Sequence, residues 1–217
     1  MYGIIQKTRN YCNMRTTPVI PAQQSGTKTD TQHSVSLHSA AEATHLFQIA
    51  RQRLLQVNNW QQVCGHALYA SFRLTDNTGR PLDRQAAPGD HIRIDLPSPG
   101  TQEGAGYDWV RIEEIAEKDS PDQTSSYIVM HVRPTAPPGH PHLPVAHFFK
   151  RFATSSFVIR RHNKKVIASI HGRNEHPNTS TDNWFDTLRN IFIGLSAMLG
   201  LSKPQWKCLA KGLIDTN

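Results

Sequence analysis

The sequence predicts an α+β fold, in which a mainly antiparallel, curved sheet of about six or seven strands packs against helices from both ends of the chain. Three observations lead to this prediction. An amphipathic helical pattern stands near the N-terminus, strand-like segments with a period of two follow without a helix between them, and helical patterns return near the C-terminus. Because turns or loops join consecutive strands, neighbouring strands should run antiparallel.

The chain of 217 residues is long enough for one domain with a sizeable core. Residues 1–32 mix Thr, Gln, Ser and Pro without a sustained period, and we expect a flexible or loosely attached N-terminal extension there. Residues 33–217 are predicted to form a single α+β domain that opens with a short strand at His33–His38.

The first helix is predicted over Ala40–Val57. Ser39 is placed to cap it, and Glu42 stands three residues later, as in a capping box. The apolar residues at helical spacing are Ala43, Leu46, Phe47, Ala50, Leu54 and Val57. Trp60 follows at once, and we interpret it as a core residue that closes the end of the helix.

Alternating apolar and polar residues predict six further strands. They are Ala67–Leu74, Ile92–Leu96, Tyr107–Ala116, Ser126–Arg133, Ser156–Arg161 and Val166–His171. The last two form a hairpin around the polar turn His162–Lys165, and the loop Pro134–Pro144 before them is too rich in proline to continue a sheet.

Two helices are predicted at the C-terminal end. Trp184–Leu199 carries an apolar stripe at helical spacing, and we expect this long helix to cover one face of the curved sheet. Ser202 and Pro204 predict the start of a short extra terminal helix.

A polar cluster directly after the hairpin is the most plausible place for a site. Its members are His171, Arg173, Asn174, Glu175, His176 and Asn178. We expect His171 at the exit of the last strand, with Gly172 releasing the chain into a polar loop. In that strand Val166, Ala168 and Ile170 should share one face, and the residues between them the other.

Net charge is +7 and the pI is about 9.5, which suits an anionic partner. The basic residues are nevertheless spread thinly, apart from a few short clusters. These are Lys150 with Arg151, and Arg160, Arg161, Lys164 and Lys165 on the predicted hairpin. A solvated, mildly basic surface is therefore favoured over a nucleic-acid footprint.

The longest apolar stretch, Ile191–Leu199, is well short of the roughly 20 residues that cross a membrane, so no membrane span is expected. Met1–Arg15 does not resemble a secretory signal, and a cytoplasmic location follows as the default expectation. Cys12, Cys64 and Cys208 are odd in number and widely spaced, which argues against a disulfide framework and a structural zinc site.

Four histidines lie in or near the proline-rich loop: His131, His140, His142 and His147. They come without neighbouring cysteines and without two histidines four residues apart on a helix, so their pattern gives little support to a metal site. We expect no metal and no cofactor.

The order of elements resembles that of the START/polyketide-cyclase helix-grip superfamily over about Val35–Leu199. The long loop before the hairpin and the helix from Pro204 depart from that pattern. The resemblance implies an apolar cavity between the sheet and the C-terminal helix, which would hold a lipid-like or aromatic molecule. The stretches GYDWVRIEE and HGRNEHPN also resemble uncharacterised bacterial proteins.

The favoured function is therefore the binding of a small apolar or amphipathic ligand, without catalysis. The residues expected to bind it are His171, Arg173, Asn174, Glu175, Trp109 and Arg111. Arginine would supply a two-pronged donor for a carboxylate or phosphate, and asparagine would add directional hydrogen bonds. The sequence leaves the identity of the ligand and the oligomeric state open.

Two other functions stay open. In an enzyme, His171 or His176 would act as general base, oriented by Glu175 or Asp108, while Arg173 would stabilise an anion. In a nucleic-acid or protein-interaction module, the basic hairpin would make the contacts.

A purely structural interpretation competes with all three functions. In it Arg173 and Glu175 pair with each other, while Asn174 and Asn178 make loop turns.

Overall fold

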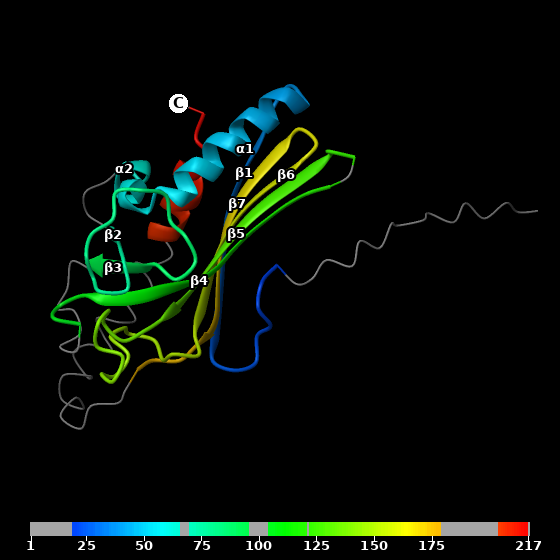
Figure 1. Cartoon of the computed structure of the whole chain (residues 1–217). Coiled ribbons are helices and arrows are strands. Elements are labelled where there is room, and N and C mark those ends of the chain that lie inside the picture. Colours follow the sequence, from blue (N-terminus) through cyan, green and yellow to red (C-terminus); the bar gives the residue numbers. More distant parts are fainter. Residues whose placement is uncertain (1–18, 66–69, 96–103, 121, 179–203, 217) are drawn as a thin grey trace, which may run out of the picture.

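The computed structural model describes residues 19–65, 70–95, 104–120, 122–178 and 204–216. They form a seven-stranded antiparallel sheet with the strand order β1-β7-β6-β5-β4-β3-β2. Figure 1 shows that the sheet is strongly curved and that the helices lie on its concave side. The predicted α+β class and the curved antiparallel sheet are confirmed.

The element bounds follow the order of the chain. The strands are β1 (Thr27–Ser36), β2 (Ser71–Thr75), β3 (His91–Asp95), β4 (Asp108–Asp119), β5 (Ser125–Pro134), β6 (Thr154–His162) and β7 (Lys165–Glu175). The helices are α1 (Ala40–Leu55), the single 3-10 turn η1 (Val57–Asn59), α2 (Trp60–Val63) and residues 204–213. The six predicted strands after the first helix are thus all present.

Strand β1 begins at Thr27, six residues before the predicted start. Its backbone pairs with β7 from Thr27 opposite Glu175 to Ser36 opposite Lys165. β1 is the edge strand of the sheet, and its side chains alternate between exposed and partly buried. Such a strand needs few apolar residues, which is why residues 27–32 read as part of a polar extension.

Strand β7 also differs from the prediction, because it continues past His171 to Glu175. The expected release into a polar loop at Gly172 is wrong. The N-terminal half of β1 supplies ladder partners for this part of β7, and the pairing outweighs the polar composition of the segment.

The capping box of α1 is present as predicted. The Ser39 hydroxyl accepts a hydrogen bond from the Glu42 backbone N–H at 3.1 Å, and Glu42 Oε2 accepts one from the His38 backbone N–H at 3.3 Å. Both bonds satisfy donors that would otherwise be free at the first turn.

The core lies between the helices and the concave side of the sheet, with Trp60 at its centre. The Trp60 ring is 5.3 Å from Phe72 and 4.8 Å from Phe157, centroid to centroid, and its indole N–H donates to the Leu54 carbonyl at 3.1 Å. Trp206, from the last helix, is 5.6 Å from Phe157. The predicted role of Trp60 as a core residue is confirmed.

Of the two helices predicted at the C-terminal end, the structure describes the short one that starts at Pro204. The long helix predicted at Trp184–Leu199 lies outside the described residues. The C-terminal helix that the structure does describe, residues 204–213, is short, and it places Leu209 and Leu213 in the core. Within the described ranges no helix is long and apolar enough to cross a membrane.

Truncating the fully buried Ile159 should test this core. We expect Ile159→Ala to lower the free energy of unfolding by about 2–5 kcal/mol, and Ile159→Val by about 0.5–1.5 kcal/mol, because each leaves a cavity that the packed sheet cannot close. Urea unfolding measures both changes. Leu143→Ala, at a side chain that is 46% exposed, is the control and should change the free energy by less than about 0.5 kcal/mol. Equal losses at both positions would contradict this description of the core.

Candidate functional site

The end of β7 divides the predicted polar cluster between the two faces of the sheet. We call the side covered by the helices the inner face and the opposite side the outer face. Val166, Ala168 and Ile170 are buried on the inner face, as predicted. Asn174 adopts a φ of 56°, and the register with β1 shifts nearby, so the alternation is interrupted before Glu175.

On the outer face His171 and Arg173 meet the same carboxylate, that of Asp30 on β1. Asp30 Oδ1 lies 2.6 Å from His171 Nδ1 and accepts a hydrogen bond from Arg173 Nη2 at 2.7 Å. His171 Nε2 lies 2.9 Å from the Ser169 hydroxyl. Arg173 therefore forms its ion pair with Asp30. The purely structural interpretation, which paired Arg173 with Glu175, is wrong on this point.

The protonation states follow from this network. Burial lowers the pKa of His171, although the hydrogen bond to Asp30 raises it. Burial alone would raise the pKa of Asp30, but the hydrogen bonds from His171 and Arg173 outweigh it and hold that pKa below its usual range. At neutral pH His171 is therefore neutral, its Nδ1–H donates to Asp30, and its Nε2 can accept from Ser169.

This carboxylate, imidazole and hydroxyl have the connectivity of an acid-base relay. Asp30 takes the orienting role that the sequence analysis gave to Glu175 or Asp108. The β-branched Thr27, Thr29 and Thr31 at every second position are a weak signal for the strand that carries Asp30, but they give no sign of its contact with His171.

On the inner face Glu175 folds back over Gly172. A Cβ at position 172 would collide with Glu175 Oε1 and Thr29 Oγ1, so only glycine leaves room for this arrangement. Glu175 Oε1 accepts a hydrogen bond from the Thr29 hydroxyl at 3.3 Å, whereas the buried Oε2 has no partner among the described residues. Burial raises the pKa of Glu175, although the bond from Thr29 lowers it.

A second buried carboxyl, Asp108, begins β4 on the side that carries the core residues Val110 and Ile112. Its Oδ2 has no partner among the described residues. Burial raises the pKa of Asp108 to about 7, although a hydrogen bond from the Phe148 backbone lowers it. Asp108 thus carries a proton for much of its time near neutral pH.

Trp109 and Arg111 lie on the other side of β4, which is separated from β7 by β5 and β6. The Trp109 ring is buried, and its N–H donates to the Gly104 carbonyl at 3.4 Å. Arg111 is exposed and stands opposite Arg133 of β5. The structure does not bring these two predicted site residues together with the cluster at the end of β7.

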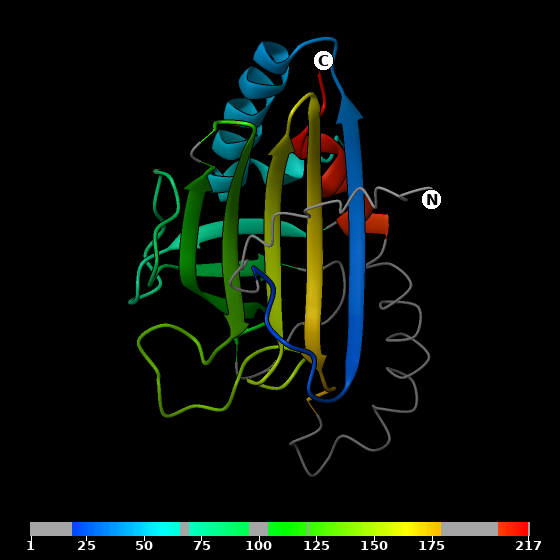
Figure 2. The same ribbon diagram turned by 90° about the vertical axis from the view of Figure 1, so that its right-hand side faces the viewer.

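The remaining polar residues of the predicted cluster form hydrogen bonds with neighbouring loop segments. Asn178 Nδ2 donates to the carbonyls of Val145 and His147, both at 3.1 Å. His176 Nε2 lies 2.9 Å from the Ser25 hydroxyl. Asn174 also binds the N-terminal segment 19–26, which crosses the outer face of the sheet in Figure 2.

The histidines considered for a metal site are held separately. His131 Nδ1 lies 2.8 Å from the Ser156 hydroxyl, and His147 Nδ1 accepts from the Phe149 backbone N–H at 2.9 Å. Burial lowers the pKa of His147 to about 3, although that hydrogen bond raises it. In the part of the chain that the structure describes, no three His, Cys, Asp or Glu side chains form a group that could hold a metal ion.

The basic hairpin offers fewer cations than its sequence indicates. Arg161 is buried, and its guanidinium donates to the Gln123 carbonyl at 2.7 Å and to the Ser126 hydroxyl at 3.0 Å. Arg160, Lys164 and Lys165 are exposed. A phosphate backbone could therefore reach three of the four basic side chains.

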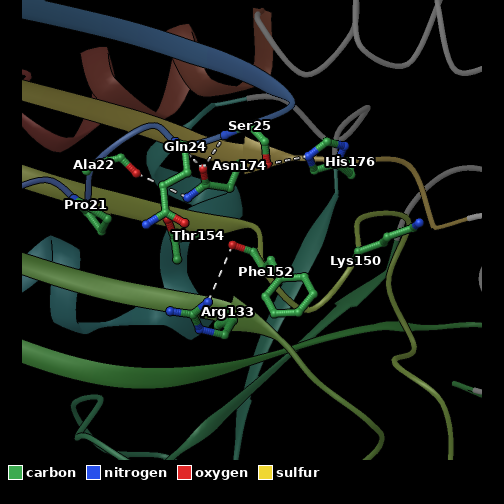
Figure 3. A pocket seen from close by; sticks show the side chains of 10 residues that line it. All are labelled: Pro21, Ala22, Gln24, Ser25, Arg133, Lys150, Phe152, Thr154, Asn174 and His176. Atoms are coloured by element: carbon green, nitrogen blue, oxygen red, sulfur yellow. Dashed lines mark hydrogen bonds between the residues drawn. The ribbon is translucent and has the colours of Figure 1, made fainter.

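A pocket of about 500 Å³ opens on the outer face at the end of β7 (Figure 3). It is lined by Pro21, Ala22, Gln24, Ser25, Arg133, Lys150, Phe152, Thr154, Asn174 and His176. Of the six residues predicted to bind a ligand, only Asn174 belongs to this lining.

No family model and no curated protein matches this chain. Among solved structures it is similar to an uncharacterized protein of Bacillus thuringiensis, with 13% identity, 87% of this chain and 100% of that chain covered, and a TM-score of 0.39. A truncated norcoclaurine synthase of Thalictrum flavum shares 9% identity over 91% of this chain and 100% of that chain, with a TM-score of 0.33.

The major latex-like protein 151 of Panax ginseng shares 10% identity with this chain. The match covers 82% of this chain and 99% of that chain, with a TM-score of 0.31. At such low TM-scores and identities, these similarities assign neither a family nor an activity.

The protonation of Asp108 should make the stability depend on pH. Its folded-state pKa of about 7 exceeds the ordinary value of 3.8, so the folded state binds the proton more tightly than the unfolded state does. Its contribution to the free energy of unfolding is therefore complete below about pH 4 and is lost as pH rises towards 7, a fall of about 4 kcal/mol. Asp108→Asn keeps an acceptor for the Phe148 N–H and should remove this fall.

Urea unfolding at pH 4, 5.5 and 7 measures the difference between Asp108→Asn and the wild type. The variant should gain relative stability at each step. The exposed Asp95→Asn is the matched control, and its difference from the wild type should stay constant. If the free energies of unfolding of Asp108→Asn and the wild type changed with pH in parallel, the Asp108 carboxyl of the wild type would not titrate as described.

The pairing of Asp30 with His171 predicts the direction of a pKa change. Asp30→Asn removes the negative charge that raises the pKa of His171 and leaves only a neutral amide oxygen as acceptor, so this pKa should fall further below its usual range. An NMR titration of the imidazole measures it, again with Asp95→Asn as the control. An unchanged or raised pKa of His171 would be inconsistent with the contact between the two side chains.

Proposed function

We propose that this protein binds a small lipid-like or aromatic molecule on the inner face of its sheet and does not catalyse a reaction. The observation that carries the proposal is the buried carboxyl of Glu175, which is 7% exposed and has one oxygen without a partner among the described residues. A buried polar atom without a hydrogen bond costs about 1–3 kcal/mol, so a ligand that supplies the bond would recover that free energy.

The surroundings of Glu175 support a ligand with an apolar body and one polar group. Thr29 and Ser155 flank Gly172 on the inner face, and the next inner-face positions are apolar, with Ile170 on β7, Phe157 on β6 and Val132 on β5. Burial raises the pKa of Glu175, so its carboxyl takes up a proton at a higher pH than an exposed one, and the protonated carboxyl can donate a hydrogen bond to a hydroxyl or carbonyl oxygen. Asp108, at the same end of the sheet, would offer a second such group.

His171 and Arg173 take an indirect part in this proposal. Both lie on the outer face, where they hold Asp30 against β7. Because Thr29 precedes Asp30 in β1, the same contacts position the Thr29 hydroxyl beside Glu175. They are therefore positioning residues for the ligand site.

The enzyme alternative rests on the relay of Asp30, His171 and Ser169. This relay lies on the opposite face from Glu175, and none of its three residues lines the pocket in Figure 3. A ligand held at Glu175 would thus be out of reach of the His171 imidazole. That arrangement favours binding over catalysis.

Native mass spectrometry of the full chain, freshly purified and compared with a denaturing run, tests the proposal. We expect either a retained small molecule whose mass is lost on denaturation, or binding when dodecanol or 2-naphthol is added as a probe. Glu175→Ala should reduce the bound fraction at least tenfold, since the ligand loses its hydrogen bond to the carboxyl.

Glu114→Ala, at an exposed glutamate of β4, is the matched control and should bind like the wild type. Circular dichroism confirms that both variants are folded. A wild-type chain that carries no ligand and binds neither probe, or a Glu175→Ala variant that binds as the wild type does, would refute the proposal.

A further inference from the structure

The outer-face pocket lies on the opposite side of the sheet from Glu175 and is independent of the proposed ligand site. The N-terminal segment 19–26 crosses the outer face of the sheet (Figures 1 and 2). The pocket forms where this segment passes the end of β5, the start of β6 and the end of β7. Arg133, Thr154 and Asn174 line it from these three strands. Its volume of about 500 Å³ is in the range of small-molecule sites.

The wall made by the N-terminal segment is fixed by Asn174. Its side-chain oxygen accepts hydrogen bonds from the backbone N–H groups of Gln24 at 2.8 Å and Ser25 at 3.2 Å, and its Nδ2 donates to the Ala22 carbonyl at 3.3 Å. Asn174 makes these bonds from a left-handed backbone conformation, with φ at 56°. Such conformations cost free energy and persist where the surrounding contacts require them.

Gly26, at the C-terminal end of the segment 19–26, packs closely against β7 and His176. Its φ is 72°, and a Cβ there would come within 2.8 Å of the His176 ring and 2.7 Å of the Glu175 carbonyl oxygen. Only glycine allows the segment to approach β7 so closely. Specific contacts of Asn174 and Gly26 therefore hold the segment 19–26 in the position that forms the pocket.

The lining of the pocket is cationic. Arg133 and Lys150 contribute permanent positive charges, His176 contributes an imidazole, and no aspartate or glutamate is among the ten lining residues. Glu113 Oε2 lies 2.9 Å from Arg133 Nε, and because both side chains are partly exposed to solvent, this ion pair is weak. The charges of the lining therefore favour an anion.

Phe152 adds an aromatic surface to this lining. Its side chain is 65% exposed, and in the described part of the chain only Leu143 is another large apolar residue of comparable exposure. Figure 3 draws its ring between the side chains of Arg133 and Lys150. An exposed aromatic ring between two cations suits a ligand that carries both a planar ring and a negative charge.

Thr154 supplies a second, independent sign of a ligand. It is 4% exposed, and its hydroxyl has no hydrogen-bond partner among the described residues although it lines the pocket. A buried hydroxyl in this state lacks the bond that such groups nearly always make. A ligand oxygen in the pocket would provide it.

We propose that this pocket binds a small aromatic anion, with its ring against Phe152 and its carboxylate or phosphate between the cations and the Thr154 hydroxyl. Both acidic groups present oxygens of the kind that arginine and lysine bind. The site needs no metal and no chemical step.

NMR titration of the full-length, isotope-labelled protein tests the proposal with three probes. Benzoate and phenyl phosphate carry the two acidic groups, and benzyl alcohol is the neutral counterpart. We expect at least one of the anions to bind at least tenfold more tightly than the alcohol, with the largest shifts at Thr154, Asn174 and Ser25. Whichever anion binds more tightly identifies carboxylates or phosphates as the class.

Two variants check the contacts. Phe152→Ala and Lys150→Glu should each weaken binding of the preferred anion at least fivefold, because the first removes the ring contact and the second reverses a charge. Lys118→Glu, at an exposed lysine near the other end of β4, changes the net charge equally and should leave binding unchanged.

Other results would overturn the proposal. They are equal binding of anion and alcohol, inorganic phosphate binding as tightly as phenyl phosphate, the same loss in Lys118→Glu as in Lys150→Glu, or shifts centred away from the pocket. Glu175→Ala should bind the anion normally, so failure here is distinguishable from failure of the proposed inner-face site.

Discussion

The pairing of β1 with β7 is the interaction on which the rest of this structure depends. The two strands are separated by more than a hundred residues, yet they pair over nearly their whole length. The pairing places the Asp30 carboxylate between His171 and Arg173 and the Thr29 hydroxyl beside Glu175. Without β1, His171 and Arg173 would lose the Asp30 carboxylate, and Glu175 would lose the hydrogen bond from Thr29.

One strand serves both faces of the sheet because side chains alternate along it and a single residue interrupts the alternation. Up to Arg173 the odd-numbered residues of β7 face outward. The left-handed conformation of Asn174 shifts the pattern, so that Glu175 folds back over Gly172 on the inner face. Asn174 itself holds the N-terminal segment over the outer-face pocket. The two proposed sites thus lie on opposite faces of the sheet beside the same short segment of β7.

Unpartnered polar atoms concentrate at this end of the sheet. Among the described residues five buried side chains have such an atom, and three of them, Asp108, Thr154 and Glu175, lie at the edge where β4 and β6 begin and β5 and β7 end. A stable core normally pairs its buried polar groups, because each unpaired one costs free energy. Their gathering at one edge, on both faces, is the physical reason to place ligands there.

The sequence by itself determined the elements whose signal is local. The capping box at Ser39, the period-two strands and the apolar stripe of α1 predicted the α+β fold and the position of the core, since short-range periodicity decides which side chains can be buried together. The sequence also pointed to the end of β7 as a polar site. Only the tertiary structure decided what those polar residues do. Asp30 and Thr29 lie in a polar edge strand that apolar periodicity cannot detect, and hydrogen bonds between residues far apart in the chain leave no local pattern.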